Sequence, residues 1–318
     1  MLATVEIRRP DPTTDFDVVL ALVQACDRAV YDDSDWTADE LREEWDDLDL
    51  EHDAWVAVDA GRIAGVMHCH GLQGDRVLLD GYVHPGATGR GAGSELLAAG
   101  EQRAAELAAA EPASAPTWVE SAHLVGDPRA PELFAGRGYA MVRTYHRMTV
   151  DLDGQLPEPV WPEGVELRPF DPARDGHRLK EAFDEAFVAE WGYVLRDYDA
   201  WAERAFGVPQ FDPELIVVAW DGDEIAAASI NYWKRLGDWG LISRLGVRPA
   251  WRRQGLGLAL LYEGFRRFAD RGETMAALGV DSENPTGATR LYERAGMRIL
   301  WRADVWRKEL RPGVQANA

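Results

Sequence analysis

The chain has 318 residues, of which 46% are apolar and 28% charged, and a formal net charge of −21. Since one hydrophobic core stops growing near ~250–300 residues, two domains are expected. No stretch approaches the ~18 uninterrupted apolar residues of a membrane span, and the N-terminus has no basic stretch before an apolar run, so we expect a cytoplasmic protein without a membrane partner. Cys26 and Cys69 are too few for a disulfide framework, and without a Cys/His spacing pattern no metal site is expected.

The negative charge is concentrated in the first half of the chain. Residues 1–155 contain 29 acidic and 12 basic residues, a net charge of −17, whereas the remainder carries 26 against 22, or −4. Such a charge repels phosphate backbones and attracts small cations. We therefore expect no nucleic-acid partner, and a small-molecule substrate that is neutral or cationic.

The first strongly patterned segment is an acidic one. Twelve carboxylates and one arginine lie between positions 32 and 53, and the stretch 37–48 is predicted to be a helix. A solvated helix face is the simpler interpretation of this charge, and a cation-binding surface is the alternative. The buried side of the helix is predicted to carry Trp36, Leu41, Trp45 and Leu48.

An internal repeat organises the chain. Four short segments recur in the same order at offsets of 158–164, which implies one fold used twice. The copies meet at 151–163, where three prolines prevent regular structure and form a semi-rigid spacer. We thus predict a first domain at 1–150, a linker at 151–163 and a second domain at 164–318. The matching segments are 5–8 with 165–168, 57–64 with 219–226, 83–93 with 247–257, and 133–138 with 291–296.

The second copy has the clearer pattern of strands and helices. β-branched and aromatic residues predict three strands separated by Asp-Gly and Gly-Asp turns. From Gly255 the apolar spacing becomes helical, and a further strand and a short helix that stops at Gly296 follow. The predicted strands are 215–220, 224–234, 239–247 and 275–281, the short helix is centred on 288–294, and a last strand begins near Met297.

A glycine turn lies between a strand and a helix in this copy. Arg252-Arg253-Gln254-Gly255-Leu256-Gly257 occupies a position where main-chain N–H groups have no partner within the helix and the helix dipole is positive. The turn therefore favours an anion. It is not a dinucleotide-binding fingerprint, since position 260 is leucine, and it is not a Walker A loop, since no Lys-Ser/Thr follows.

The turn belongs to a larger set of motifs that carries a resemblance. Leu245-Gly246-Val247-Arg248-Pro249, the glycine turn, Val280-Asp281-x-x-Asn284 and the segment 291–297 together resemble the acetyl-CoA-binding core of the GCN5-related N-acetyltransferases. The resemblance covers nearly all of 164–310 and, more weakly, 4–148. It implies an α/β fold with a mixed sheet, in two tandem domains similar to those of mycothiol synthase and related acetyltransferases.

The resemblance also implies roles for residues of the second copy. The main chain at Leu245, Gly246 and Val247 would bind the pantetheine arm of acetyl-CoA, Asn284 would hydrogen-bond the cofactor, and Tyr292 would protonate the departing thiolate. No metal is implied. The residues expected at the pyrophosphate are Arg252, Arg253, Gln254, Gly255, Leu256 and Gly257.

The first copy departs from this pattern. Thr88 stands where the second copy has Arg252, and Phe134 replaces Tyr292, so the acid is missing. Arg90, Gly91 and Gly93 still offer a turn for a pyrophosphate. We therefore expect a degenerate first domain that binds acetyl-CoA, shapes the substrate cleft or dimerises, with catalysis in the second domain; the chain would be a monomer or a homodimer.

The general base is not evident from the sequence. The fourth strand of the second copy has Leu241 and Ser243 where many relatives have a carboxylate. The expected function is direct acetyl transfer to a primary amine of a small molecule. Mycothiol synthesis, by acetylation of a cysteinyl amine, and a non-catalytic acyl-CoA-binding module are the alternatives. The candidate bases are Glu190, Asp197, Asp238 and Asp281, and an aromatic acceptor pocket would draw on Trp191, Tyr193, Tyr198 and Trp201.

Overall fold

The computed structural model describes residues 5–34, 36–110, 116–236, 239–284 and 286–312, and it divides into two compact units. Unit 1 contains the chain up to Tyr145 and again from Trp301, and unit 2 contains His146–Leu300. Among the described residues, no helix is long and apolar enough to cross a membrane.

Both halves of the sequence form the same series of elements, which confirms the predicted repeat. Each half runs strand, two helices, three strands, helix, strand, helix, strand. The first half comprises β1 (Glu6–Arg8), α1 (Phe16–Tyr31), α2 (Ala38–Asp47), β2 (Ala54–Asp59), β3 (Arg62–Gln73), β4 (Arg76–Val83), α3 (Ala92–Ala110), β5 (Thr117–Leu124), α4 (Arg129–Gly136) and β6 (Ala140–Asp151). The second comprises β7 (Val165–Leu167), α5 (Pro172–Phe187), α6 (Tyr198–Phe206), β8 (Val217–Asp221), β9 (Glu224–Leu236), β10 (Trp239–Val247), α7 (Leu256–Asp270), β11 (Met275–Asp281), α8 (Ala288–Arg294) and β12 (Arg298–Arg311).

Short 3-10 turns complete the series: η1 (Pro85–Ala87) and η3 (Pro249–Trp251) follow β4 and β10, and η2 (Pro213–Leu215) precedes β8. The predicted acidic helix is α2, which Thr37 caps through a reciprocal pair of hydrogen bonds with Glu40. Leu41 and Trp45 are its buried residues, as predicted, whereas Trp36 and Leu48 lie outside the helix and are half-buried.

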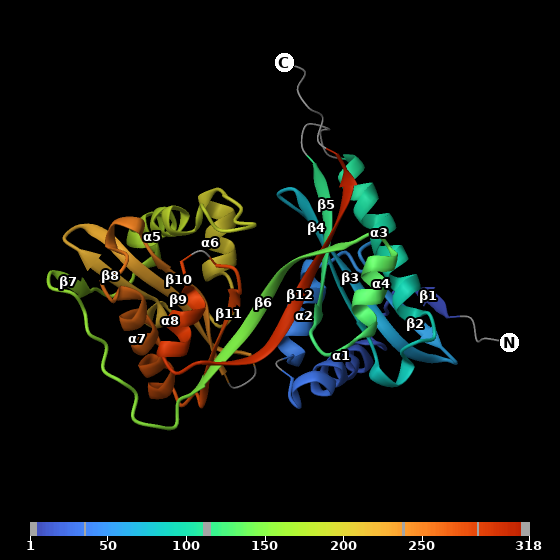
Figure 1. Ribbon diagram of the computed structural model, residues 1–318, viewed down its shortest axis with the longest axis horizontal. Helices are drawn as coiled ribbons and strands as arrows, with labels where there is room; N and C mark the ends of the chain where they lie inside the picture. The colour runs from blue at the N-terminus through green and yellow to red at the C-terminus, as the bar shows by residue number, and fades with distance from the viewer. Residues whose placement is uncertain (1–4, 35, 111–115, 237–238, 285, 313–318) are drawn as a thin grey trace, which may run out of the picture. The chain divides into compact units, whose positions relative to one another are not determined.

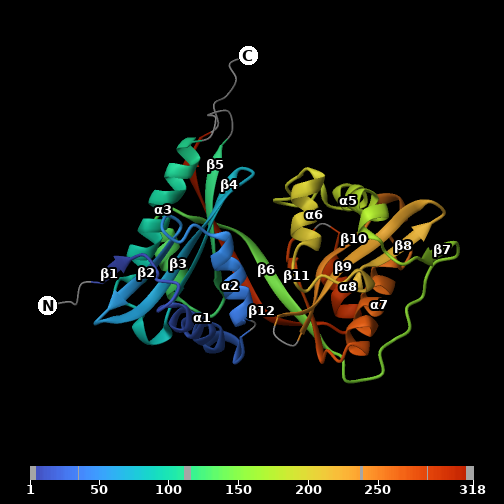
Figure 2. The same ribbon diagram turned by 180° about the vertical axis from the view of Figure 1, so that it is seen from behind.

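In unit 1 the sheet runs in the order β1-β2-β3-β4-β5-β12 and carries helices on both faces. Alternate side chains of each strand point to opposite faces. Val56 and Val66 therefore pack with α1 and α2, whereas Ala57 and Met67 pack in the core that contains α3. Figure 1 shows α3 and α4 in front of the strands of this unit, and Figure 2 shows α1 and α2 from the other side.

Unit 2 has the sheet order β6-β11-β10-β9-β8-β7 and the same layering. Along β8, Val218 and Trp220 pack in the core that contains α5 and α6, while Val217 and Ala219 pack against α7. Because both faces are covered, the strands of this unit are nearly continuously apolar, as in Val217–Asp221. The mixed α/β fold with two tandem copies is thus confirmed.

The compact units differ at their ends from the predicted segments 1–150 and 164–318. Strand β12, from the second half of the sequence, pairs antiparallel with β5 in unit 1, with Val305 opposite Ala122. Strand β6 continues from the first half into unit 2, where it neighbours β11. Each unit therefore takes a last strand from the other half of the sequence, while the proline-containing segment between β6 and β7 lies entirely in unit 2.

Candidate functional site

The strands β10 and β11 of unit 2 pair over only a short length. They run parallel in register from Trp239–Leu241 to Met275–Ala277. Beyond an irregularity between Ile242 and Arg244, β10 continues antiparallel to β9 up to Val247. Among the described residues, no registered pairing with β11 extends past Leu241, so the end of β10 has a main-chain edge without a strand neighbour on that side.

The glycine turn after β10 forms an uncapped helix start. Arg253 and Gly255 have positive φ, 63° and 92°, and Gly255 is the N-cap of α7 without a side-chain hydrogen bond. The first N–H groups that bond back into the helix are those of Leu258 and Ala259, which both donate to the Gly255 oxygen. The N–H groups before them are therefore available to an anion.

Helices α5 and α6 of unit 2 have the side-chain cap that α7 lacks. Asp171 accepts hydrogen bonds from the first N–H groups of α5, and Asp197 does the same for α6. These aspartates neutralise the helix starts. The glycine at the start of α7 leaves that positive end open, as an anion site requires.

Two of the predicted cofactor-binding glycines have packing roles. A Cβ at Gly246 would lie 3.0 Å from Cδ1 of Phe183, so this glycine allows α5 to approach β10. A Cβ at Gly257 would lie 2.8 Å from Cδ2 of Leu291, so this glycine allows α8 to approach α7. Close packing therefore favours glycine at both positions, whatever they bind.

The side chains of the turn divide into two groups. Arg252 donates from Nε to the Val247 oxygen at 3.1 Å and from Nη2 to the Ala186 oxygen at 3.0 Å, and so links the end of β10 to α5. Leu256 is buried in the core beneath α7. Arg253 and Gln254 are exposed, so among the turn's side chains these two face solvent beside the uncapped helix start.

Asn284 and Glu190, in loops after β11 and α5, form a half-buried pair. The Asn284 amide donates to Oε1 of Glu190 at 3.0 Å, while its oxygen accepts from the N–H of Thr286 at 2.9 Å. Burial raises the pKa of Glu190, and the charge of Asp281 adds to the shift. The Asn284 side chain is thus held by the protein itself, and its predicted bond to the cofactor stays a prediction.

Of the four candidate bases, Glu190 is the one that this arrangement favours. Asp197 is occupied as the cap of α6, accepting from the N–H of Ala200 at 2.8 Å. Asp281 accepts from the N–H of Glu283 in a local turn. Asp238 lies outside the described residues.

Tyr292 is buried near Glu190. The residue is 8% exposed and packs in the core of unit 2 around Phe265. Burial, and then the charge of Glu190, hold the pKa of the phenol above its usual range. The phenol is therefore fully protonated at neutral pH, as a proton donor must be.

A polar chain on the α5 side of unit 2 was not predicted. The Tyr193 hydroxyl donates to Oδ1 of Asp184 at 2.6 Å, and Lys180 donates to Oδ2 of the same carboxylate. Burial and Asp184 raise the pKa of Tyr193, whereas the charge of Arg244 acts in the opposite direction. The i, i+4 spacing of Lys180 and Asp184 was the available signal, but that spacing is common on solvated helices.

The predicted aromatic acceptor pocket is not assembled as expected. Trp201 is buried in the core with Phe206, at right angles to its ring. Tyr198 stacks on His177 with centroids 3.6 Å apart. Tyr193 joins the polar chain beside Arg244.

Unit 1 repeats the main-chain geometry of the glycine turn, but the side chains around the turn differ. Strands β4 and β5 pair parallel over Arg76–Leu79 and Trp118–Ser121 and no further among the described residues. Gly91, with φ of 97°, precedes α3, but Arg90 is bound to Asp59 at 2.9 Å. Phe134, in place of the tyrosine, stacks on Trp306 with centroids 5.7 Å apart.

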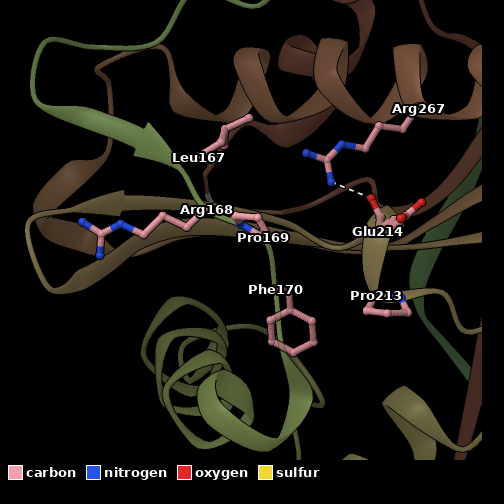
Figure 3. Close-up of a pocket in the computed structure, with 7 residues that line it drawn as sticks. All are labelled: Leu167, Arg168, Pro169, Phe170, Pro213, Glu214 and Arg267. Carbon is pink, nitrogen blue, oxygen red and sulfur yellow. Dashed lines mark hydrogen bonds between the residues drawn. The ribbon is translucent and has the colours of Figure 1, made fainter.

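A separate cavity of about 440 Å³ lies elsewhere in unit 2. Figure 3 shows that Arg267 borders it, donating to the main-chain oxygen of Glu214. Arg267 belongs to the last turn of α7, whereas the glycine turn lies at the opposite end of this helix. The cavity is therefore not part of the candidate site. Its lining comprises Leu167, Arg168, Pro169, Phe170, Pro213, Glu214 and Arg267.

Comparison with known proteins gives concordant matches. The model of the acetyltransferase (GNAT) family matches residues 16–120 and 177–297. The mycothiol acetyltransferase of Thermobispora bispora is 34% identical over 236 residues, which are 70% of this chain and 72% of that protein. The mycothiol acetyltransferase of Streptomyces coelicolor is 29% identical over 252 residues, 76% of this chain and 74% of that protein.

Solved structures match over the whole chain. A GCN5-related N-acetyltransferase from Sphaerobacter thermophilus superposes with a TM-score of 0.87 and 33% identity, covering 98% of this chain and 97% of that one. A tandem GNAT protein from the clavulanic acid biosynthesis pathway, solved without acetyl-CoA, has a TM-score of 0.70 at 16% identity, covers 98% and 100% of the two chains, and shows the fold alone.

Proposed function

The chain belongs to the acetyltransferase (GNAT) family and is an N-acetyltransferase; from this premise we propose that it transfers the acetyl group of acetyl-CoA directly to a primary amine of a small molecule, with the reaction in the second copy. The observation that carries the proposal is the combination, in unit 2, of an uncapped glycine turn with the diverging strands β10 and β11. Tyr292 occurs only in that copy, since the first has Phe134 at the matching position.

The residues at the turn fit the phosphates of acetyl-CoA. The main-chain N–H groups of the turn from Arg253 to Gly257 have no acceptor in α7, and Arg253 adds a positive charge. The open edge of β10 at Leu245 and Val247 suits an extended amide-bearing chain such as pantetheine. When bound, acetyl-CoA supplies an acetyl group activated as a thioester. We assign the turn of unit 1 a weaker or absent affinity, since Asp59 holds Arg90.

Two side chains of unit 2 are suited to moving protons. An alkyl amine of pKa ~10.4 needs about 4–5 kcal/mol to be neutral at pH 7, so a base must receive its proton. We assign this role to Glu190, directly or through water, with Asn284 as its positioning residue. Tyr292 gives its proton to the leaving thiolate, an uphill transfer of at least about 2 kcal/mol from pKa ~10 to ~8.5, and more because burial raises its pKa.

Acetylation of a cysteinyl amine is the second candidate function. The identity of 34% to the mycothiol acetyltransferase of Thermobispora bispora favours it. The absence of a carboxylate at Leu241 and Ser243 of β10 argues for a different acceptor. A cytoplasmic place of action, as a monomer or a homodimer, remains part of the proposal; the unpaired Cys26 and Cys69 are compatible with a reducing compartment.

The test is turnover of acetyl-CoA with a panel of amines. The full chain is incubated with acetyl-CoA and neutral, cationic and cysteinyl amines, and free thiol release is followed together with the mass of the product. We expect acetyl transfer to a nitrogen of one class of small amine. Thiol release that no amine accelerates, or acetyl groups found on an oxygen, would contradict the proposal.

A further inference from the structure

A cluster of ionisable side chains in unit 1 takes no part in the function proposed above. Helix α2 contributes Glu44, strand β3 contributes His68 and His70, and strand β4 contributes Asp80. His68 lies directly opposite Asp80 in the β3–β4 pairing, so these side chains share one face of the sheet with His70. The same face packs against α1 and α2.

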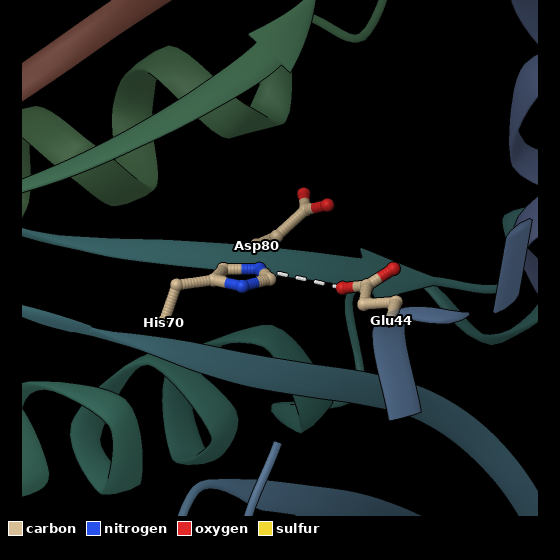
Figure 4. Close-up of side chains that lie close together, drawn as sticks. All are labelled: Glu44, His70 and Asp80. Atoms are coloured by element: carbon tan, nitrogen blue, oxygen red, sulfur yellow. Dashed lines mark ion pairs between the residues drawn. The ribbon is translucent and has the colours of Figure 1, made fainter. Parts of the chain in front are cut away.

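The geometry points to a metal site, and we propose that Glu44, His70 and Asp80 bind one divalent transition-metal ion of the zinc class. One ligand atom from each residue lies within 4.8 Å of the others. Nε2 of His70 is 3.3 Å from Oε1 of Glu44. Bonds of about 2.0–2.1 Å in a tetrahedral zinc site separate neighbouring ligand atoms by about 3.3–3.4 Å. Figure 4 shows the three side chains converging from separate elements.

A second set of residues orients the ligands. Trp45 Nε1, which can only donate, lies 3.2 Å from Nε2 of His68. His68 therefore accepts at Nε2 and carries its proton on Nδ1, from which it donates to Oε1 of Glu44 at 2.7 Å. His68 thus fixes the Glu44 carboxylate. Such partners are typical of metal-ligating carboxylates.

The third ligand has a partner of the same kind. The Tyr82 hydroxyl donates to Oδ2 of Asp80 at 3.2 Å, which leaves Oδ1 as the ligand oxygen. Tyr82 is itself held edge-on against Trp36, with centroids 6.2 Å apart. His68 and Tyr82 therefore hold the Glu44 and Asp80 carboxylates in place through hydrogen bonds. Carboxylates on a solvated helix face are not usually held in this way.

The donor set indicates the class of metal. One imidazole and two carboxylates suit zinc and neighbouring first-row ions, whereas Mg²⁺ and Ca²⁺ favour sites made of oxygen alone. The Glu44 side chain is 12% exposed and that of His70 27%, so an ion can reach the site from solvent. Two carboxylates so near each other with little solvent repel one another, and a divalent cation balances their charge. Three protein ligands leave a fourth position open.

The test is zinc binding by the full chain after treatment with a chelator. Calorimetry of the wild type with Zn²⁺ should give one site per chain. Asp80→Asn, which keeps the shape of the side chain, should weaken binding by about tenfold or more. His52→Gln is the matched control, because His52 is an exposed histidine of unit 1 paired with Asp49. It should bind Zn²⁺ as the wild type does.

Two further measurements do not depend on the folding of a variant. At free Zn²⁺ 100-fold above the dissociation constant, the folded-to-unfolded ratio of the wild type should rise about 100-fold, seen as a higher Tm. X-ray absorption of the zinc-loaded wild type should show nitrogen and oxygen ligands without sulfur. A wild type that does not bind Zn²⁺, equal affinity in Asp80→Asn, or sulfur ligation would overturn the proposal. So would a cluster that binds a small protonated amine but not the metal.

Discussion

The assignment of Glu190 as base makes a prediction about the pH profile. The wild-type kcat/KM should rise with pH as Glu190 ionises, at a pH above the usual carboxyl range because burial raises its pKa. In Glu190→Gln this acid limb should vanish, and kcat/KM should fall by ~10²–10⁴, the usual contribution of a general base.

Substitution of Asn284 should shift the pKa of Glu190 by an amount that follows from their hydrogen bond. The hydrogen bond from Asn284, 3.0 Å long, favours the ionised form of Glu190. A hydrogen bond to a charged group contributes about 1.5–3 kcal/mol, and one pKa unit corresponds to about 1.4 kcal/mol. Asn284→Asp removes this donor and adds a charge, while an oxygen remains for the N–H of Thr286. The acid limb should therefore move up by at least about one unit.

The assay is the pH dependence of kcat/KM for the amine identified in the panel. Glu181→Gln, at an exposed position of α5, is the matched control and should leave the profile unchanged. A wild-type acid limb in Glu190→Gln, in a folded protein, would refute the assignment. An unshifted limb in Asn284→Asp would remove the positioning role of the amide.

The remaining predictions concern the turn and the packing beneath it. Arg253→Gln should weaken acetyl-CoA binding by about tenfold in calorimetry through loss of one charge-assisted contact, whereas Arg204→Gln, exposed on α6, should not; equal affinities would count against the phosphate site. Gly246→Ala should lower the free energy of unfolding by about 1–3 kcal/mol in urea titrations, because its Cβ would lie 3.0 Å from Phe183. Gly279→Ala, whose Cβ meets no atom within 4 Å, is the control, and similar losses in both variants would contradict the packing argument.

Local patterning was enough to predict the elements of the second copy. The predicted spans 239–247 and 275–281 coincide with β10 and β11, and 288–294 coincides with α8. Alternating or continuous apolar runs between turns fix such segments without any tertiary information. The exchange of last strands was not predictable in the same way. The pairing of β12 with β5 is long-range, and both halves end in a strand of the same kind.

The position of the glycine turn was predicted, but its contacts were not. The motif correctly located the turn before α7, whose positive φ at Gly255 requires glycine. It could not show that Arg252 is engaged by the oxygens of Val247 and Ala186, since those contacts join separate elements.

The hydrogen bond between Glu190 and Asn284 could not be predicted from the sequence either, because it links a loop after α5 to one after β11. The three residues proposed to bind a metal in unit 1 also come from three elements. No spacing pattern in the sequence indicates such a site, and the sequence therefore predicted none.

Acetyl transfer in the second copy, with Tyr292 as its acid, is tested most directly by the kinetics of single-residue variants. Tyr292→Phe should lower kcat by ~10²–10⁴ with little change in acetyl-CoA affinity. Tyr262→Phe, which removes a hydroxyl from the half-buried tyrosine of α7, and Phe134→Leu in the first copy should retain most of the turnover. Near wild-type kcat in a folded Tyr292→Phe, or an equal and large loss in folded Phe134→Leu, would contradict a single active copy that depends on this phenol.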